Sequence, residues 1–271
     1  GGQLARMLAL AGYPLGISTL CMDPALGVCA DQVTDVINAD FIDEVALANF
    51  LSQVNVVTYE SENIPVKLVE KINQICPVYP SSKALAISQD RLYEKQLCQR
   101  LGIPTARFAE INSPEDLQDA VMHIGLPAIL KTRRWGYDGK GQFVLKTEHD
   151  IESAWTALGS QALILEEFLS FENEVSLISV QGLGESTPVF YPLIENHHQE
   201  GILVYSHAPY QNAALQELAQ QYAQKILQEV DYIGVLTIEF FQVQGKLRVN
   251  EIAPRVHNSG HWTIEGADCS Q

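Results

Sequence analysis

The segment from Lys131 to Lys140 gathers positive charge in an otherwise acidic chain. Four of the 17 lysines and arginines fall in these ten positions, while the sequence carries 33 acidic residues and a formal net charge of −16. Gly136 and Gly139 lie among them and Gly141 follows directly, and glycines let backbone N–H groups approach an anion closely. Because lysines add point charges suited to phosphate, the pattern favours a flexible loop that closes over a polyphosphate. A solvated hairpin turn is the alternative, and the spacing is not that of a P-loop.

Two glutamates are expected side by side further along the chain. Glu239 lies in the predicted strand 235–241, and Glu251 ends the predicted strand 247–251. Gln244 and Gly245 predict a hairpin turn between the two strands. Opposed like charges destabilise a sheet unless a cation lies between them, and Mg²⁺ binds one or two carboxylates together with substrate phosphates. The pair therefore indicates a magnesium site, with two exposed surface acids as the alternative.

A polar stretch follows the second glutamate directly. Residues 253–262 show no apolar periodicity and are dense in hydrogen-bonding side chains. Their position after the predicted metal-binding strand favours an anion-binding role for Arg255 and His257. An ordinary surface loop has a similar composition.

The elements that must position these groups follow two patterns. In the first third of the chain, helices predicted at 3–11, 43–51 and 65–75 alternate with β-rich runs at 15–22, 33–37 and 54–59. Such alternation indicates a parallel sheet with helices on both faces. A helix at 88–101 and a domain change near 81–104 follow.

Strands then succeed one another with few helices, which is typical of antiparallel α+β structure. After a strand beyond residue 105, we expect helices at 114–124 and 212–230 and further strands at 127–131, 143–145, 163–167, 174–180 and 187–193. The predicted domains are an N-terminal α/β domain at 1–88, a small domain with the glycine-rich loop at 89–168, and a body with the metal and anion site at 169–271.

Composition restricts the possible partners and compartment. A chain of this acidity repels phosphate backbones and anionic lipid at long range, which argues against nucleic acid and membrane surfaces as partners. No uninterrupted apolar run has membrane-spanning length. The five scattered cysteines include no Cys-x-x-Cys pair, so buried reduced thiols in a cytoplasmic protein are expected.

Taken together, these motifs resemble the ATP-grasp ligases. Lys131, the loop 136–142, the segment 166–169, Glu174 and the glutamate pair occur in ATP-grasp order. More narrowly, the loop and residues 250–262, with Gly2-Gln3-Leu4 and residues 190–199, are similar to the 5-(carboxyamino)imidazole ribonucleotide synthase family, the ATPase subunit of phosphoribosylaminoimidazole carboxylase. The likeness covers essentially the whole chain.

The resemblance implies a preATP-grasp domain followed by a two-part ATP-grasp domain with an antiparallel sheet. It implies a homodimeric enzyme of de novo purine biosynthesis that uses ATP, Mg²⁺ and bicarbonate to carboxylate aminoimidazole ribonucleotide through carboxyphosphate.

It also implies roles for individual residues. The nucleotide would be bound at its phosphates, adenine and ribose by Arg91, Lys131, Gly136, Tyr137, Asp138, Gly139, Lys140, Gly141, Gln142, Glu166, Glu167, Phe168, Leu169, Glu174, His198 and Asn250. Within this set, 166–169 would meet adenine and Glu174 the ribose hydroxyls. Glu239 and Glu251 would bind magnesium. Bicarbonate and carboxyphosphate would be held by Arg255, His257 and Asn258, and the substrate amine would meet Asp138 with Tyr137 beside it.

Three departures from the family pattern and two alternatives accompany this interpretation. Trp135 stands where the loop usually carries glycine, Gly1 would normally follow a first strand, and Gln271 would precede a C-terminal domain, so we expect that strand and that domain to be missing. One alternative is another ATP-grasp carboxylase or ligase, like biotin carboxylase or the formate-dependent glycinamide ribonucleotide transformylase. The other is a non-catalytic nucleotide-binding ATP-grasp protein. The stretch 257–262 disfavours the first, and retention of Arg255 with both glutamates disfavours the second.

Overall fold

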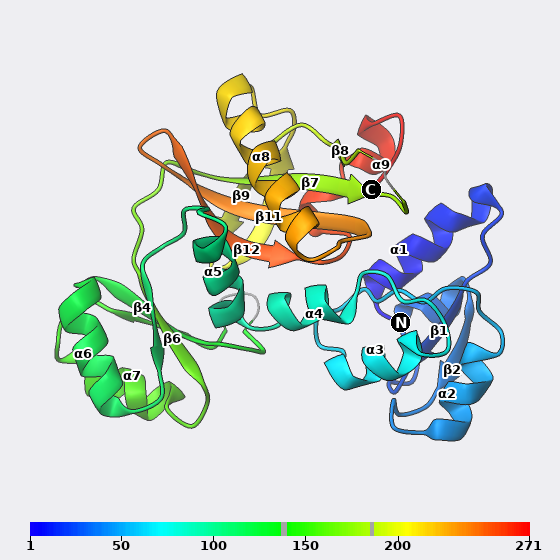
Figure 1. Cartoon of the computed structure of the whole chain (residues 1–271), viewed down its shortest axis with the longest axis horizontal. Coiled ribbons are helices and arrows are strands. Elements are labelled where there is room, and N and C mark those ends of the chain that lie inside the picture. The colour runs from blue at the N-terminus through cyan, green and yellow to red at the C-terminus, as the bar shows by residue number, and fades with distance from the viewer. Residues whose placement is uncertain (137–139, 185–186) are drawn as a thin grey trace.

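The structure, a computed structural model, describes residues 1–136, 140–184 and 187–271. Figure 1 shows three groups of elements in chain order, and each encloses its own cluster of buried apolar side chains. Tyr137, Asp138 and Gly139, which the sequence analysis assigns to the site, lie outside the described residues. Among the helices of the described ranges, none is long and apolar enough to cross a membrane.

The N-terminal group is built on two short strands, β1 (Leu20–Asp23) and β2 (Asp35–Asn38), which pair in parallel. Helices α2 (Glu44–Leu51) and α3 (Val66–Asn73) pack apolar side chains against them, and α1 (Gln3–Gly12) precedes them in the chain. The parallel pairing confirms the predicted α/β character of this region.

Two predicted strands of this group need correction. The run 15–22 forms a strand only from Leu20, because Tyr13–Leu15 is a short 3-10 helix and Gly16 turns the chain at a φ of 74°. The run 54–59 makes only a single bridge, between Val57 and Val78. Residues 77 and 80 on either side of Val78 are prolines, which lack the N–H needed to extend a ladder.

The helix predicted at 88–101 is confirmed as α5 (Arg91–Arg100), which begins three residues later than expected, and an unpredicted short helix, α4 (Ser82–Ser88), precedes it. Asp90 separates them, and its side chain accepts a hydrogen bond from the N–H of Leu92 at 3.1 Å. This cap satisfies one of the free donors at the start of α5. Gly102, at a φ of 66°, follows the end of α5 as expected.

The small central group is an antiparallel sheet in the order β3-β6-β4-β5 with two helices on one face. Its elements in chain order are β3 (Phe108–Ile111), α6 (Pro114–Ile124), β4 (Ala128–Thr132), β5 (Gln142–Leu145), α7 (Asp150–Leu158) and β6 (Leu163–Glu167). Helix α7 is not among the predicted elements, although Ile151, Ala154, Trp155 and Leu158 recur at helical spacing and pack against the core of this group.

The large body is an antiparallel sheet in the order β10-β9-β7-β11-β12, with β8 beside β7. Its strands are β7 (Asn173–Gln181), β8 (Val189–Phe190), β9 (Ile194–Gln199), β10 (Ile202–His207), β11 (Gly234–Val243) and β12 (Lys246–Ala253). The strand predicted at 187–193 is largely wrong, since only two residues pair there, and β9 and β10 are not predicted. β9 is rich in histidine and amide side chains, and β10 exposes its apolar ones, so neither has the usual strand pattern.

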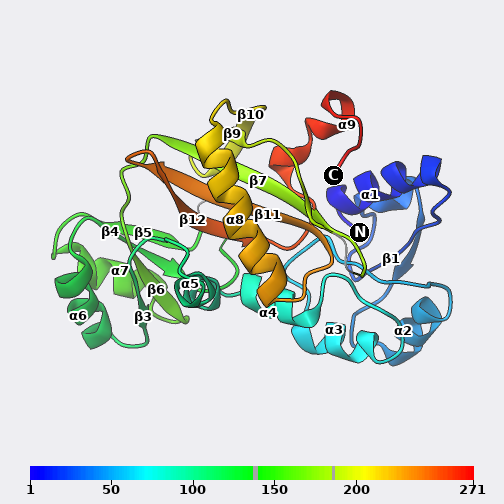
Figure 2. The ribbon, with the colours of Figure 1, turned by 45° about the horizontal axis from the view of Figure 1, so that its top comes forward.

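Helix α8 (Ala213–Glu229) crosses one face of this sheet, as Figure 2 shows. Its buried stripe includes Leu215, Ala219 and Ile226, which pack with Ile238 and Phe240 of β11. The opposite face of the sheet is therefore left for polar side chains, since residues alternate between faces along a strand. The short helix α9 (Thr263–Gly266) lies near the end of the chain.

The cysteines are all free, which agrees with the expected absence of disulfides. Cys76 and Cys98 are buried, but Cys29 and Cys269 are exposed, so the expectation of buried thiols is wrong for those two. Burial raises the pKa of Cys98 to about 12.

Candidate functional site

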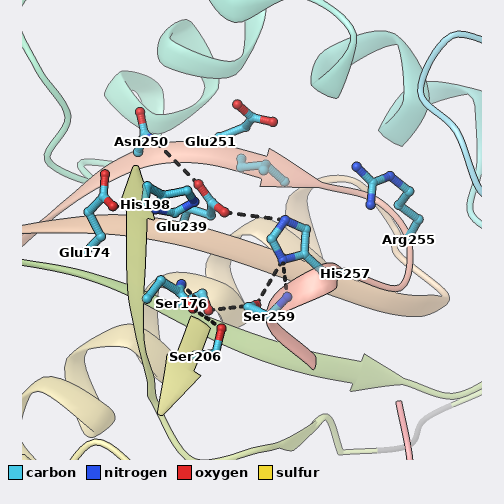
Figure 3. A network of polar contacts seen from close by, with 12 residues as sticks. Glu174, Ser176, His198, Ser206, Glu239, Asn250, Glu251, Arg255, His257 and Ser259 are labelled. Atoms are coloured by element: carbon cyan, nitrogen blue, oxygen red, sulfur yellow. Dashed lines mark hydrogen bonds and ion pairs between the residues drawn. The ribbon is translucent and has the colours of Figure 1, made fainter. Parts of the chain in front are cut away.

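A row of polar side chains crosses the sheet face that lies opposite α8. Glu239 on β11 is paired in register with Ser176 on β7 and with Glu251 on β12. Glu174 on β7 is paired with Asn196 on β9. Figure 3 shows Glu174, Ser176, Glu239 and Glu251 as neighbouring side chains.

The two glutamates are side by side, as predicted. Gln244 and Gly245 have φ values of 51° and 71°, which form the tight turn that joins β11 to β12. The register between the strands then skips Asn250, so β12 bulges there. Because of the bulge, two successive side chains approach Glu239: Glu251 in register, and Asn250, whose Nδ2 lies 3.5 Å from Glu239 Oε2.

The surroundings of the two carboxylates differ. Burial raises the pKa of Glu239 to about 7, and the charge of Glu251 adds to this effect. Burial also acts to raise the pKa of Glu251, but the charge of Arg91 and its hydrogen bond to this carboxylate outweigh the effect, so the pKa of Glu251 is lowered. Glu251 is therefore held as an anion, whereas Glu239 lacks a comparable cationic partner.

Helix α5 fastens the bulge through three charged side chains on one of its faces. Arg91 Nη1 donates to Glu251 Oε2 at 3.3 Å. Lys95 Nζ donates to the carbonyls on either side of the bulge, at 3.2 Å to Val249 and 2.8 Å to Asn250. Glu94 accepts a hydrogen bond from the N–H of Ile252. Glu94 and Lys95 are each 1% exposed, so α5 fixes β12 from inside the protein.

The small sheet contributes a second charged pair from the face opposite α6 and α7. Lys131 Nζ on β4 donates to Glu166 Oε2 on β6 at 2.9 Å, and Lys95 Nζ lies 3.8 Å from the same oxygen. Burial raises the pKa of Glu166, but the two lysines outweigh it and lower the pKa to about 2. Glu166 Oε1 is buried without a hydrogen-bond partner, so the pair keeps one unused acceptor.

The remaining part of the predicted adenine segment is Glu167, the last residue of β6, and the two residues that follow it. Glu167 binds Arg107, with 3.2 Å between its Oε2 and Nε, and lies 3.8 Å from Arg248 of β12. Phe168 is half exposed and Leu169 partly buried.

The glycine-rich loop is anchored at both of its described ends. The N–H of Thr132 donates to the carbonyl of Gly141 at 2.8 Å, and Arg91 Nη2 donates to the carbonyl of Gly136 at 3.2 Å. Gly141 has a φ of 69°, and a Cβ there would lie 2.5 Å from Thr132 Oγ1. Glycine is therefore required at 141 by both conformation and space. Lys140 and Gln142 lie on the exposed side of this end.

Trp135 has a φ of 64°, a left-handed conformation that is unusual for a large side chain. Its side chain is 66% exposed and lines a hollow of about 370 Å³ together with Tyr93 and Arg134. Buried Asp90 forms ion pairs with the two arginines that precede the loop. Its Oδ2 lies 2.8 Å from Arg133 Nη2 and 3.3 Å from Arg134 Nε.

Glu174 and His198 form a pair between β7 and β9, with His198 Nδ1 in hydrogen-bond contact with Glu174 Oε2. This contact raises the pKa of His198 more than burial lowers it. The two predicted nucleotide contacts are thus neighbours on the polar face, next to Glu239 (Figure 3).

The stretch after β12 brings a histidine into the row. His257 Nε2 lies 3.4 Å from Glu239 Oε1, and the ring is nearly buried. Burial, together with the charge of Arg255, lowers the pKa of His257 to about 4, so the ring is neutral at pH 7. Arg255 itself forms an ion pair with Glu62 of the N-terminal group at 2.7 Å. Asn258 is exposed at the start of a 3-10 helix.

The glutamate pair has the donor chemistry that magnesium requires. Oxygen ligands from one or two carboxylates, completed by substrate phosphates, are what this ion binds. Glu239 and Glu251 are in register on adjacent strands, so their carboxylates repel each other when both are ionised, and a divalent cation between them would relieve this repulsion. Within the described ranges, His, Cys, Asp and Glu side chains form no group of three or more placed to hold a metal ion by themselves.

Several residues of the site escape sequence reasoning. Glu94 and Lys95 are three and four positions after Arg91, hence on its helix face, which is a signal that a helical projection of α5 gives. Ser176 is two residues after Glu174 and thus on the same strand face. Asn196 and Ser259 give no such signal, because the pairing of β9 and the path of the last loop are needed to place them.

Comparison with known protein families gives two matches. The ribonucleotide synthetase preATP-grasp domain family matches residues 1–89, and the ATP-grasp domain family matches residues 96–271.

Individual relatives agree with these families. The chain is 50% identical to the N5-carboxyaminoimidazole ribonucleotide synthase of Pseudomonas aeruginosa, over 100% of this chain and 75% of that protein. The crystal structure of the synthetase of this name from Thermus thermophilus has a TM-score of 0.94 and 49% identity, covering 99% of this chain and 73% of that one. A synthase from Aspergillus clavatus, in complex with ADP and 5-aminoimidazole ribonucleotide, has a TM-score of 0.85 and 29% identity, covering 98% and 71%.

Proposed function

We propose that this chain, which belongs to the N5-carboxyaminoimidazole ribonucleotide synthase family of ATP-grasp ligases, carboxylates 5-aminoimidazole ribonucleotide with bicarbonate and ATP in purine biosynthesis. The observation that carries the proposal is the opposed Glu239/Glu251 pair, with Arg91 bound to Glu251 and His257 Nε2 facing Glu239 at 3.4 Å. A phosphoryl transfer needs positioning and neutralisation of charge more than covalent help, and this arrangement offers both.

The reaction divides into two steps. A bicarbonate oxygen forms a bond to the γ-phosphorus of ATP, the bond to the β–γ bridging oxygen breaks, and ADP leaves with the electron pair. The exocyclic amine of the ribonucleotide then bonds to the carboxyl carbon of carboxyphosphate. Inorganic phosphate leaves and the amine gives up one proton, which yields the N5-carboxylated product.

The nucleotide would lie between the two sheets. Arg91 and Lys131 supply positive charge to its phosphates, and the loop 136–142, from Gly136 to Gln142, covers them. Residues 166–169 meet adenine, and Glu174 with His198 lies near the ribose. In support, Arg91 contacts both the loop and Glu251, and Lys131 is held in place by Glu166.

Glu239 and Glu251, with Asn250 beside them, are the residues that would hold Mg²⁺. The ion, when bound, would neutralise the phosphate oxygens as charge moves from the γ-phosphoryl group to ADP.

Arg255, His257 and Asn258 are proposed to hold bicarbonate and carboxyphosphate. Support comes from His257, whose ring points at the metal-site glutamate from the loop that follows β12 (Figure 3). Asp138, with Tyr137 beside it, is proposed to meet the substrate amine. The proposal extends to a cytoplasmic homodimer, and the five free thiols are compatible with a reducing compartment.

The test is ADP release in the presence of Mg²⁺ and bicarbonate, with and without aminoimidazole ribonucleotide. We expect ADP formation to rise with the ribonucleotide and to fall to background when bicarbonate is omitted. ATP binding without ribonucleotide-dependent ADP would keep the ATP-grasp fold but overturn the purine assignment, in favour of another ligase or a non-catalytic binding protein.

A further inference from the structure

A chain of buried polar side chains runs beneath the proposed metal and anion site. It begins at Ser206 on β10, passes through Asn196 on β9 and Ser176 on β7, and reaches Ser259 and His257 in the loop after β12 (Figure 3). Ser176 and Ser259 are 0% exposed and Asn196 is 6% exposed. Buried polar groups are costly unless each finds a partner, so this chain has a definite hydrogen-bonding pattern.

The hydrogen bonds run in one direction along the chain. Ser206 Oγ donates to Asn196 Oδ1 at 2.8 Å, and Asn196 Nδ2 donates to Ser176 Oγ at 2.9 Å. Ser176 Oγ then donates to Ser259 Oγ at 2.9 Å. A serine hydroxyl has one proton to give, and Ser259 Oγ lies 2.9 Å from His257 Nδ1. The end of the chain is therefore a donor directed at Nδ1.

A second, longer contact acts on the same ring nitrogen. The backbone N–H of Ser259 points at His257 Nδ1 over 3.3 Å. A backbone N–H can only donate, so whichever way the Asn196 amide and the serine hydroxyls are turned, this contact favours an Nδ1 that accepts. At 3.3 Å it is too long to hold the tautomer without the Ser259 hydroxyl. With both donors present, Nδ1 carries no proton, and the ring proton must be on Nε2. Nε2 is the atom that faces Glu239 Oε1 at 3.4 Å.

We propose that Ser176, Asn196 and Ser259 are positioning residues that hold His257 as the Nε2–H tautomer, so that this ring donates a hydrogen bond to an anion and does not act as a base. The tautomer follows from the hydrogen bonds alone. The identity of the anion, a bicarbonate or carboxyphosphate oxygen, rests on the proposed function.

The contact that Nε2–H makes in the free protein is a weak one. At 3.4 Å it is longer than an ordinary N–H···O bond, which lies at about 2.7–3.2 Å. An anion oxygen placed closer to Nε2 would therefore replace Glu239 as the acceptor. With Nδ1 occupied and Nε2 already protonated, the ring has no free lone pair with which to take a proton from bicarbonate or from the substrate amine.

The direct test is the tautomer of His257 in the free protein, read from ¹⁵N spectra of protein labelled at its seven histidines. The His257 signals are assigned by their loss in His257→Gln. We expect a protonated, pyrrole-type Nε2 and an unprotonated, pyridine-type Nδ1. In Ser259→Ala, which loses the hydroxyl donor, we expect a mixture of the two tautomers. Its KM for bicarbonate should rise by about five-fold, while the KM for ATP stays near that of the unsubstituted protein.

Ser179→Ala is the matched control. Ser179 is 0% exposed on the same strand, but its hydroxyl donates to the carbonyl of Leu236 at 3.1 Å, outside the chain. This variant should keep the tautomer of the unsubstituted protein.

Three results would overturn the inference: a protonated Nδ1 in the unsubstituted protein, an unchanged tautomer in Ser259→Ala, or an equal change in Ser179→Ala. The first readout needs no variant, so misfolding of one does not remove the test. No substrate is present in the spectra, so a wrong tautomer is distinguishable from failure of the proposed carboxylation.

Discussion

At the scale of single residues, Glu239 and Glu251 occupy equivalent places on neighbouring strands but have different protonation. The guanidinium of Arg91 at 3.3 Å keeps Glu251 ionised, while burial raises the pKa of Glu239 to about 7. A cation bound between them would favour the ionised form of both. Glu251 is therefore the carboxylate that is ready to bind the ion first.

Glu251→Gln should lower ribonucleotide-dependent ADP formation by about 100-fold, because the neutral amide removes charge from the proposed magnesium site without changing the side-chain volume. Steady-state ADP release at saturating Mg²⁺ measures the effect. Glu217→Gln, on the exposed side of α8, is the matched control and should be near normal. Near-normal turnover in Glu251→Gln would contradict the metal-ligand role.

Glu166 gives a prediction for the dependence of stability on pH. Its pKa falls from an ordinary 4.5 to about 2 in the folded protein, because Lys131 and Lys95 outweigh the effect of burial. A lowered carboxylate pKa stabilises the fold above the unfolded pKa, and this stability is lost as the pH falls from 4.5 towards 2.

The loss corresponds to about 3 kcal/mol in the free energy of unfolding. Urea denaturation at pH values between 5 and 2.5 should therefore show a shallower acid loss in Glu166→Gln than in the unsubstituted protein. Glu152→Gln, exposed on α7, should retain the full acid loss. Parallel curves for all three proteins would rule out this role for Glu166.

The large charged groups of the site could be predicted from the sequence and the small polar ones could not, for a physical reason. Two acids on either side of a turn, or four basic residues among glycines, are anomalies that local sequence shows. A serine in a strand is ordinary, and Ser176 gains meaning only when β9 and the loop with Ser259 come next to it. The assignment of substrate contacts to Arg255 and Asn258 stays a prediction.

At the scale of elements, α5 links the two sheets of the proposed nucleotide site. Its charged side holds the bulge of β12 through Arg91, Glu94 and Lys95, and its apolar side packs Leu97 and Cys98 into the core of the body. Asp90 at its start binds Arg133 at the entrance to the glycine-rich loop. One helix therefore sets both the metal-site strand and the loop.

Lys95→Met should lower the free energy of unfolding by about 3 kcal/mol, because it leaves two buried carbonyls and part of the charge of Glu166 without a partner. Urea denaturation measures the change, and the Mg²⁺ concentration needed for half-maximal ADP formation should rise as the bulge loosens. Lys225→Met is the control: this exposed lysine also donates to a carbonyl, that of Leu101, and should cost within about 0.5 kcal/mol. Equal effects of the two substitutions would contradict the special position of Lys95.

Trp135→Gly tests the unusual conformation of the loop. A non-glycine residue in the left-handed conformation destabilises the fold by about 1–2 kcal/mol. Glycine removes this strain, but its greater freedom in the unfolded chain cancels about half of the gain in stability. We expect a slightly higher melting temperature together with a changed KM for ATP, since loop closure is altered. Unchanged kinetics would show that the tryptophan does not affect closure.

Element prediction succeeds where the apolar pattern is strong. The strands at 163–167, 235–241 and 247–251 and the long helix α8 are confirmed within a few residues, because their buried positions follow the expected period. β9 and β10 are missed because the first carries site residues and the second is an exposed edge strand. Helix α7 is missed although its apolar residues have helical spacing and pack on the core. Apolar periodicity indicates which residues are buried, so it predicts poorly those strands whose side chains lie in the site or on the surface.

At the scale of the whole molecule, three separate cores meet around one polar region. Arg248 of β12 lies 3.8 Å from Glu167 of the small sheet, and Arg255 binds Glu62 of the N-terminal group. A nucleotide bound between the sheets would add contacts to both at once. Ligand binding should therefore stabilise the association of the groups as well as each group itself.

ATP with Mg²⁺ at about 100 times its dissociation constant should raise the melting temperature by roughly 5 °C. Removal of Mg²⁺ with EDTA should abolish most of this rise in melting temperature, because the phosphates and the carboxylates of Glu239 and Glu251 then repel each other. In Glu251→Gln the increase should be smaller and insensitive to EDTA. An identical increase with and without EDTA in the unsubstituted protein would exclude the proposed magnesium site.

The row of polar side chains across the large sheet also protects the pairing of its strands during folding. Glu239 and Ser176 share a face with Glu174, while their immediate neighbours Ile238 and Val175 pack on the face under α8. A slip of β11 by one residue would press a carboxylate into that apolar interface and turn the buried isoleucine towards water. Misregistered sheets are thus unstable, and selection for the chemistry of this face also selects against one route to misfolding and aggregation.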